Sequence, residues 1–343
     1  MKTKNGGLLI LTVIAIFFWG CSPKVSLEDL EPKIVESGFI YDEAAFPSCH
    51  ASTVVETEKG LLAAWFGGTH ERHPDVCIYT SAREGERWSP PQMVADGVIN
   101  DTLRYPCWNP VLYRRNNGDV ILYYKVGPNP MEWWGMYKIS GDEGKTWSEA
   151  IVIPDNLLGP IKNKPVTLKN GTILYPTSFE TPEEWNIYVE MSDQDLSNWR
   201  KVDIDNNGFN AIQPTVLFHD GGRLQMLCRS REQRIVETWS DDQGETWTPV
   251  EATSLPNNNS GIDAVTCTNG LQLLIYNPIT RGRNKLSVAG SLDGKEWEDL
   301  IVLEDQPEGE FSYPAIIQGK DGTIHMTYTY NREKIKYVHL KLN

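Results

Sequence analysis

The sequence has 343 residues, of which 40% are hydrophobic, and its 12 tryptophans and 14 tyrosines supply ample apolar material for a core, which excludes a disordered chain. Its 46 acidic residues against 32 basic ones leave a formal net charge of −14, which excludes a nucleic acid as the expected partner because a phosphate backbone would be repelled. The same negative charge would repel any acidic ligand, so binding such a ligand would need a local group of basic residues.

The first residues have the pattern of an export signal. A short basic start is followed by the apolar run from Leu8 to Trp19, which is too short for a membrane-spanning helix. The ending Phe18-Trp19-Gly20-Cys21 resembles the bacterial lipobox, in which a signal peptidase cuts before a cysteine that becomes lipidated. We expect residues 1–21 to be a lipoprotein signal peptide ending at lipidated Cys21, and residues 22–37 to be a tether.

This pattern predicts an exported bacterial lipoprotein that contacts the membrane through its lipid anchor. Its place would be the outer membrane, on the periplasmic or the cell-surface face. The alternative is a plain secretory signal in which the cysteine is incidental.

A tryptophan-containing turn motif recurs through the chain. Segments 140–147 and 240–247 follow the pattern Ser-x-Asp-x-Gly-x-Thr-Trp, and a shortened copy occupies residues 291–297. Segments 81–88 and 192–199 keep the spacing from Ser to Trp. Because Asp and Gly favour tight turns, and Ser and Thr can bond the local backbone, we interpret these segments as structural β-hairpin turns and not as catalytic groups.

A second repeat occurs six times with a period of roughly 50 residues, which is typical of a propeller or a solenoid. Each copy has a polar residue, usually before proline, and then two strands rich in β-branched and aromatic residues around a turn. The copies begin at His50, Asn109, Lys164, Gln213, Asp263 and Tyr313. The two repeats predict an all-β fold, a six-bladed β-propeller of four-stranded antiparallel blades over residues 38–343, with residues 38–41 as the strand that closes the ring.

The propeller geometry brings the six starting residues together, because the first strand of each blade lies nearest the axis. This ring of unlike polar groups indicates a ligand site at one mouth of the channel, the alternative being a water-filled funnel. Basic residues are dense in the same segments, and a guanidinium fork binds a carboxylate at two points. We therefore expect a glycan with a carboxylate as the ligand. The expected substrate-binding residues are Arg229, Arg231, Arg281, Arg283, Lys164, Lys125, Asn109, Gln213, Asp263 and Trp65.

The tryptophan turns on a six-bladed propeller resemble the Asp-boxes of the sialidases and their BNR-repeat relatives, over essentially the whole chain after the signal. The resemblance implies three arginines for the substrate carboxylate, an aspartate acid, and a tyrosine nucleophile activated by a glutamate. It implies that Tyr313 is the nucleophile, that Arg229 is the second arginine, and that segment 281–283 contains the third.

The sequence departs from the family pattern at three places. The segment Phe46-Pro47-Ser48-Cys49-His50 has no arginine where the first arginine is expected, and Gln213 occupies the place of the activating glutamate. The acid loop offers both Glu71 and Asp75. Because blades one and six are neighbours in a closed ring, His50 should approach Tyr313 and could act as a base.

These residues predict a sialidase-like exo-glycoside hydrolase that acts on a terminal or adjacent acidic sugar, sialic or uronic, of a glycan. Tyr313, His50, Glu71 and Asp75 are its candidate catalytic residues. One alternative is a polysaccharide lyase, or a rhamnose-glucuronate-type hydrolase, acting on uronate-containing glycans. Another is a non-catalytic glycan-binding propeller. No metal-ligand spacing is apparent, and no cofactor is expected.

Overall fold

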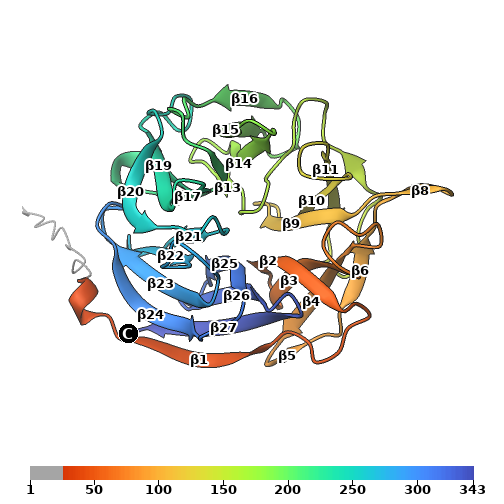
Figure 1. Cartoon of the computed structure of the whole chain (residues 1–343), viewed down its shortest axis with the longest axis horizontal. Helices are drawn as coiled ribbons and strands as arrows, with labels where there is room; N and C mark the ends of the chain where they lie inside the picture. The colour runs from red at the N-terminus through yellow and green to blue at the C-terminus, as the bar shows by residue number, and fades with distance from the viewer. Residues whose placement is uncertain (1–25) are drawn as a thin grey trace, which may run out of the picture.

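The computed structural model describes residues 26–343, which form six blade sheets arranged around a central axis and one small two-stranded sheet (Figure 1). Five sheets contain four strands, and the sheet of blade one has a fifth strand because its outer edge is divided. The predicted six-bladed all-β propeller is therefore confirmed. None of the helices within residues 26–343 is long and apolar enough to cross a membrane.

The first three blades follow one another along the chain. Blade one contains β2 (Ser48–Glu56), β3 (Gly60–Gly68), β4 (Cys77–Glu84), β5 (Arg87–Trp88) and β6 (Gln92–Ala95). A small hairpin of β7 (Val98–Asn100) and β8 (Leu103–Arg104) connects it to blade two. Blade two contains β9 (Cys107–Arg114), β10 (Val120–Val126), β11 (Trp134–Ser140) and β12 (Ile151–Val152). Blade three contains β13 (Val166–Thr167), β14 (Ile173–Glu180), β15 (Trp185–Ser192) and β16 (Arg200–Asp203).

The remaining blades complete the ring. Blade four contains β17 (Ala211–Phe218), β18 (Leu224–Ser230), β19 (Arg234–Ser240) and β20 (Glu251–Pro256). Blade five contains β21 (Asp263–Thr266), β22 (Gln272–Tyr276), β23 (Lys285–Ser291) and β24 (Glu298–Asp305). Blade six contains β25 (Phe311–Gln318), β26 (Ile324–Tyr330), β27 (Lys334–Leu342) and β1 (Pro32–Phe39). Two short 3₁₀ helices cover Leu27–Asp29 and Asp220–Gly222.

The ring is closed by the first strand of the chain, β1, which pairs antiparallel with β27 as the outer strand of blade six (Figure 1). The sequence predicted this closing strand at residues 38–41, so the prediction placed it too late. Residues 32–37, assigned to the tether, belong to the propeller, because Pro32 already pairs with Leu342. The sequence of this outermost strand, PKIVESGF, has no regular alternation of polar and apolar residues, and most of its side chains are exposed, so it gave no clear strand pattern.

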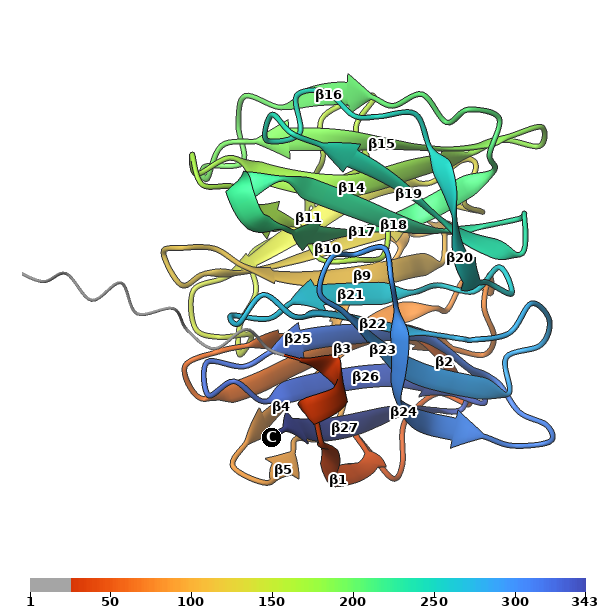
Figure 2. The ribbon, with the colours of Figure 1, turned by 90° about the vertical axis from the view of Figure 1, so that its left-hand side faces the viewer.

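The strands run along the propeller axis, so that their turns gather at the two ends (Figure 2). Because neighbouring strands are antiparallel, the loop between the second and third strands of each blade lies at one end. The tryptophan turns between the third and fourth strands lie at the other end. We call the first end the mouth and the second the turn end.

Apolar side chains pack between neighbouring blades. Each of the six interfaces between adjacent blades has its own cluster of buried hydrophobic residues. Trp65, a predicted substrate-binding residue, is fully buried in the cluster between blades six and one and stacks on Tyr41 with 5.2 Å between ring centroids. Trp65 is therefore a core residue, and that prediction is wrong.

The turn motifs are held by their own side chains. Ser140 Oγ donates to Asp142 and accepts from the backbone N–H of Gly144, both at 2.8 Å. The Asp142 carboxylate also accepts the N–H and the hydroxyl of Thr146, at 2.8 and 2.6 Å. These hydrogen bonds hold the pKa of Asp142 at about 2, and they support the structural interpretation of the motif.

Candidate active site

The backbone at the mouth has a repeated irregularity in the first strands. Ala51, Asn109, Gln213 and Tyr313 have left-handed φ angles of 55°, 37°, 56° and 50°, and each lies at a break in strand register. Such bulges turn a side chain away from the sheet, and a left-handed non-glycine residue costs about 1–3 kcal/mol. The equivalent residue of blade one is therefore Ala51, so the predicted repeat, which began at His50, was one residue out of register there.

Tyr313 lies against the guanidinium of Arg229. Arg229 Nη1 donates to the Tyr313 hydroxyl at 2.7 Å and to Gln213 Oε1 at 3.2 Å, and the Gln213 amide donates to the same hydroxyl at 3.3 Å. Arg229 is only 6% exposed and is fixed from behind by Asn259, whose side-chain oxygen accepts from Nε at 3.1 Å. The buried cation and the tyrosine hydroxyl are thus held in a defined geometry.

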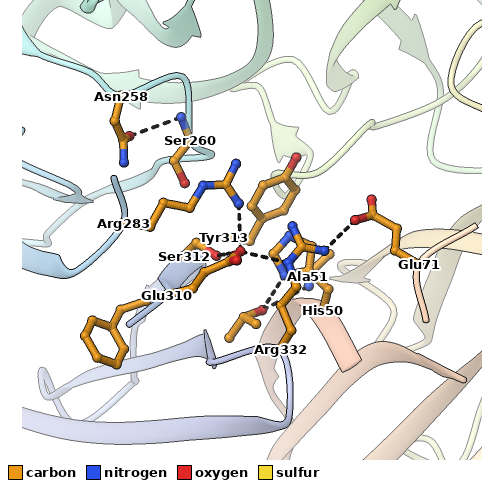
Figure 3. A network of polar contacts seen from close by, with 12 residues as sticks. His50, Ala51, Glu71, Asn258, Ser260, Arg283, Glu310, Ser312, Tyr313 and Arg332 are labelled. Atoms are coloured by element: carbon orange, nitrogen blue, oxygen red, sulfur yellow. Dashed lines mark hydrogen bonds and ion pairs between the residues drawn. The ribbon is translucent and has the colours of Figure 1, made fainter. Parts of the chain in front are cut away.

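Two further arginines stand near the same tyrosine (Figure 3). Arg283 lies with its guanidinium carbon 5.7 Å from the centre of the Tyr313 ring, and it pairs with Glu310 at 2.8 Å. Arg332 donates to the same Glu310 oxygen at 2.9 Å and also pairs with Glu71. Three arginines from blades four, five and six therefore surround one face of the mouth.

Arg332 was missed by the sequence reasoning. It lies in the turn between β26 and β27, at the mouth end of the last hairpin, and its φ of 57° is left-handed. The signal for it in the sequence is its place in the segment Tyr330-Asn331-Arg332-Glu333, directly after the second strand of the last repeat.

Comparison with known proteins supports this architecture. A family model described as the BNR repeat-like domain matches residues 59–326. The chain belongs to this family. A sialidase of Bacteroides fragilis (strain YCH46) is 23% identical over 330 residues, covering 80% of this chain and 60% of that protein. An anhydrosialidase of Macrobdella decora is 22% identical over 237 residues, covering 60% of this chain and 30% of that protein. The chain thus spans 60% and 30% of the lengths of these two relatives.

Solved structures show the same fold at low sequence identity. A Dyadobacter fermentans protein of unknown function superposes with a TM-score of 0.74 and 16% identity over 91% of this chain and 99% of that one. The Hadza microbial sialidase Hz136 gives a TM-score of 0.70 and 20% identity over 85% and 65%. A K499G mutant of the NanB sialidase of Streptococcus pneumoniae gives 0.68 and 14% over 87% and 69%. The predicted relation to sialidases and BNR-repeat proteins is confirmed.

In this BNR repeat-like protein, His50 contacts Tyr313 through its ring and not through a hydrogen bond. The ring centroids are 4.1 Å apart, and His50 Nδ1 lies 3.0 Å from Thr329 Oγ1. His50 Nε2 is buried and has no partner within the described residues. Burial, with further effects of Arg332, Arg283 and Arg229, holds the pKa of His50 well below its usual value. The predicted approach of His50 to Tyr313 is therefore present, but His50 packs against the ring.

The channel behind the mouth is filled by paired charges. Lys164 donates to both carboxylate oxygens of Asp263, at 2.9 and 3.0 Å, and Asp263 also accepts from Thr215 Oγ1 at 2.7 Å. Lys162 is buried beside them, and its Nζ donates to the carbonyl of Ile262 at 3.0 Å. Burial lowers the pKa of Lys162 to about 7. Lys164 and Asp263, both predicted to bind substrate, join blades three and five instead.

The remaining predicted residues are divided between core and surface. Lys125 is fully buried and donates to the carbonyl of Pro160 at 2.7 Å, so it supports the loop that contains Pro160 and does not reach a ligand. Burial lowers the pKa of Lys125 to about 7. Asn109 is 5% exposed. Arg281 is exposed, and Arg231 stacks on Trp185 with its guanidinium carbon 3.8 Å from the ring centre.

The two candidate acids differ in their surroundings. Glu71 faces the arginines through its pair with Arg332 (Figure 3). Asp75 accepts from the N–H and the hydroxyl of Thr69 at 2.9 and 2.6 Å, which ties down the base of its own loop. Burial acts to raise the pKa of Asp75, but the Thr69 and His73 contacts hold it below its usual value. Of the two, Glu71 is the one directed into the site.

The site as a whole combines a fixed tyrosine hydroxyl with three guanidinium groups and two glutamates. No group of three or more His, Cys, Asp or Glu side chains within residues 26–343 is placed to hold a metal ion. A cavity of about 430 Å³ lies at the turn end beside Arg83 and Trp88. None of the residues of the mouth lines this cavity. The chemistry that the mouth can offer is recognition of an anion next to a polarised hydroxyl.

Proposed function

We propose that this protein is a sialidase-like glycoside hydrolase that acts on a glycan with a terminal or adjacent acidic sugar. The observation that supports this most directly is the Arg229 guanidinium, buried and hydrogen-bonded to Tyr313 at 2.7 Å, with Arg283 over the same ring. Among residues 26–343, every hydrogen-bond partner of Arg229 is neutral, namely Asn259, Gln213 and Tyr313. A buried cation without an ion-paired carboxylate favours an anionic ligand.

In this proposal the arginines orient the sugar through its carboxylate. Arg229 contributes its buried positive charge and is oriented by its hydrogen bonds to Asn259, Gln213 and Tyr313. Arg283 and Arg332 are held in place by their shared Glu310. The bound sugar would then present its anomeric carbon to the Tyr313 hydroxyl. Arg332 of blade six takes the place of the arginine that the family pattern expects on blade one, where the segment ends in Cys49-His50.

A second candidate is a non-catalytic glycan-binding propeller, and Gln213 favours it. An amide cannot accept the proton of Tyr313, and the hydroxyl is approached by Gln213 and Arg229 alone among the described residues. His50, the other potential base, makes only a ring contact. In this candidate the mouth binds an acidic glycan and leaves it unchanged.

Product analysis separates these candidates. The purified protein is incubated with sialyl-conjugates and uronate-containing oligosaccharides, and products are followed by mass spectrometry and by absorbance of unsaturated uronates. A released acidic sugar that has gained the elements of water supports the hydrolase. Rising absorbance without uptake of water would instead identify a lyase, and binding without product would identify a glycan-binding protein.

We also propose that the protein is exported and anchored by a lipid at Cys21. Residues 1–25 lie outside the part of the chain that the structure describes, so this proposal depends on the sequence pattern of residues 1–21. Metabolic labelling with a fatty-acid analogue tests it, with Cys21→Ala as the matched variant. Label on the wild type and none on the variant is expected, and equal labelling of both would contradict the anchor.

A further inference from the structure

A cavity of about 340 Å³ lies at the mouth beside the arginine and tyrosine cluster, lined among others by Glu180, Trp185, Arg72, Arg231 and Met131. Arg229 connects the two places. Its guanidinium carbon lies 5.6 Å from the Tyr313 ring centre and 5.7 Å from the Trp185 ring centre. A ligand group bound at Tyr313 would therefore have this cavity as its neighbour.

The two carboxyl groups expected to act as acids are both engaged. Glu71 is paired with Arg332, and Asp75 accepts two hydrogen bonds from Thr69. Glu310, the third carboxyl group of the cluster, is shared by Arg283 and Arg332. Burial acts to raise the pKa of Glu310, but Arg332 and Arg283 hold it below its usual value, so Glu310 is a poor proton donor.

Glu180 differs from all three. It is the last residue of β14, and its side chain lies at the wall of the cavity. No hydrogen bond or ion pair to its carboxylate is found within residues 26–343. Burial raises the pKa of Glu180, against the opposing effect of Arg229, Arg231 and Arg72 and with a smaller contribution from Glu71. A partly buried carboxyl group with a raised pKa, facing a cavity, is the usual form of a general acid.

We propose that Glu180 is the general acid of this protein and that the cavity which it lines holds the leaving group of the glycan. This inference rests on the proposed function. As the bond between the anomeric carbon and the glycosidic oxygen breaks, its electron pair stays on that oxygen, which takes the proton of the Glu180 carboxyl group. The leaving group departs as an alcohol. Water then adds to the anomeric carbon and returns a proton to the Glu180 carboxylate, so that hydrolysis consumes one water.

The dependence of the rate on the leaving group tests this role. Glu180→Gln is compared with wild type on two substrates of the acidic sugar that the protein releases, a natural disaccharide and the 4-methylumbelliferyl glycoside. The aryl alcohol is a good leaving group that needs little protonation. We expect kcat/KM to fall about 10²- to 10⁴-fold on the disaccharide and less than about tenfold on the aryl glycoside. The fall of kcat/KM at alkaline pH, which reports loss of the acid proton, should also disappear.

Glu184→Gln is the matched control, because Glu184 is an exposed carboxylate on the same β14–β15 loop. It should match the wild type on both substrates, and thermal unfolding of both variants checks that each is folded. An equal loss on both substrates, or a leaving-group-selective loss in Glu71→Gln or Asp75→Asn instead, would overturn the role of Glu180. Wild-type protein that releases no acidic sugar from sialyl-conjugates or uronate-containing oligosaccharides would overturn the proposed function itself, and the inference with it.

Discussion

At the turn end of the propeller, segments 140–147 and 240–247 repeat the same hydrogen bonds. In both segments the Gly backbone N–H donates to the Ser hydroxyl at 2.8 Å, and the Thr hydroxyl donates to the Asp carboxylate at 2.6 Å. At the mouth, four equivalent bulges present Ala51, Asn109, Gln213 and Tyr313, which share a backbone conformation but place a methyl group, two carboxamides and a phenol there. Uniform residues at equivalent positions perform a structural task. Unlike residues held at equivalent strained positions indicate a site whose asymmetry suits a ligand.

The largest expected effect is at the mouth. Tyr313→Phe removes only the hydroxyl, and Arg229 keeps its contact with Gln213. If the hydroxyl takes part in the chemistry, kcat should fall about 10²- to 10⁴-fold while KM changes little. Steady-state kinetics on the acidic glycan measures this. An unchanged kcat would remove Tyr313 from the mechanism and leave it as a wall of the pocket.

The next effect concerns recognition. Arg229→Ala should lower kcat/KM, or the affinity where no turnover occurs, by about 10²- to 10³-fold because a buried charge-assisted contact is lost. Arg200→Ala is the control, since Arg200 is a half-exposed residue paired with Glu245 on the tryptophan turn. Titration calorimetry compares the two variants. Equal binding by both would show that the mouth does not recognise the anion through Arg229.

At the turn end the expected effect falls on stability. Asp242→Ala removes the acceptor of the Thr246 N–H and hydroxyl, so the free energy of unfolding should fall by about 1–3 kcal/mol. Activity should stay within about twofold of the wild type at permissive temperature. Urea unfolding and kinetics on the same sample check both statements. A large loss of activity without loss of stability would contradict the assignment of a structural role to the turn end and a functional role to the mouth.

The smallest effect is a pH dependence of stability in the channel. Burial lowers the pKa of Lys162 to about 7 in the folded protein, whereas an unfolded lysine has a pKa near 10.4. Between these values the unfolded chain binds more protons, so stability should rise with pH, by about 1 kcal/mol from about pH 7 to about pH 8. Thermal unfolding of wild type and Lys162→Met measures the slope. The same slope in both proteins would contradict a buried, deprotonating lysine.

The fold could be predicted from the sequence because its two repeats have fixed spacing and each repeat unit is one contiguous segment of the chain. The site could be predicted only in part. Tyr313, Arg229 and Arg283 follow from the repeat and from the family resemblance. Arg332 was not predicted although it follows the second strand of the last repeat, and Glu180 was suggested by neither pattern. The sequence also could not tell that Lys164 and Asp263 neutralise each other across the channel, since that pairing joins blades three and five. Partners of this kind depend on distances that repeat spacing does not contain.

The most direct test of the central claim compares two ligands that differ only in charge, an acidic sugar and its carboxamide. Isothermal titration with wild-type protein should show binding of the free acid that is at least about 10²-fold tighter than binding of the carboxamide, and this preference should disappear in Arg229→Ala. Equal affinity for the acid and the carboxamide would contradict the account, because the three arginines at the mouth would then have no carboxylate to recognise.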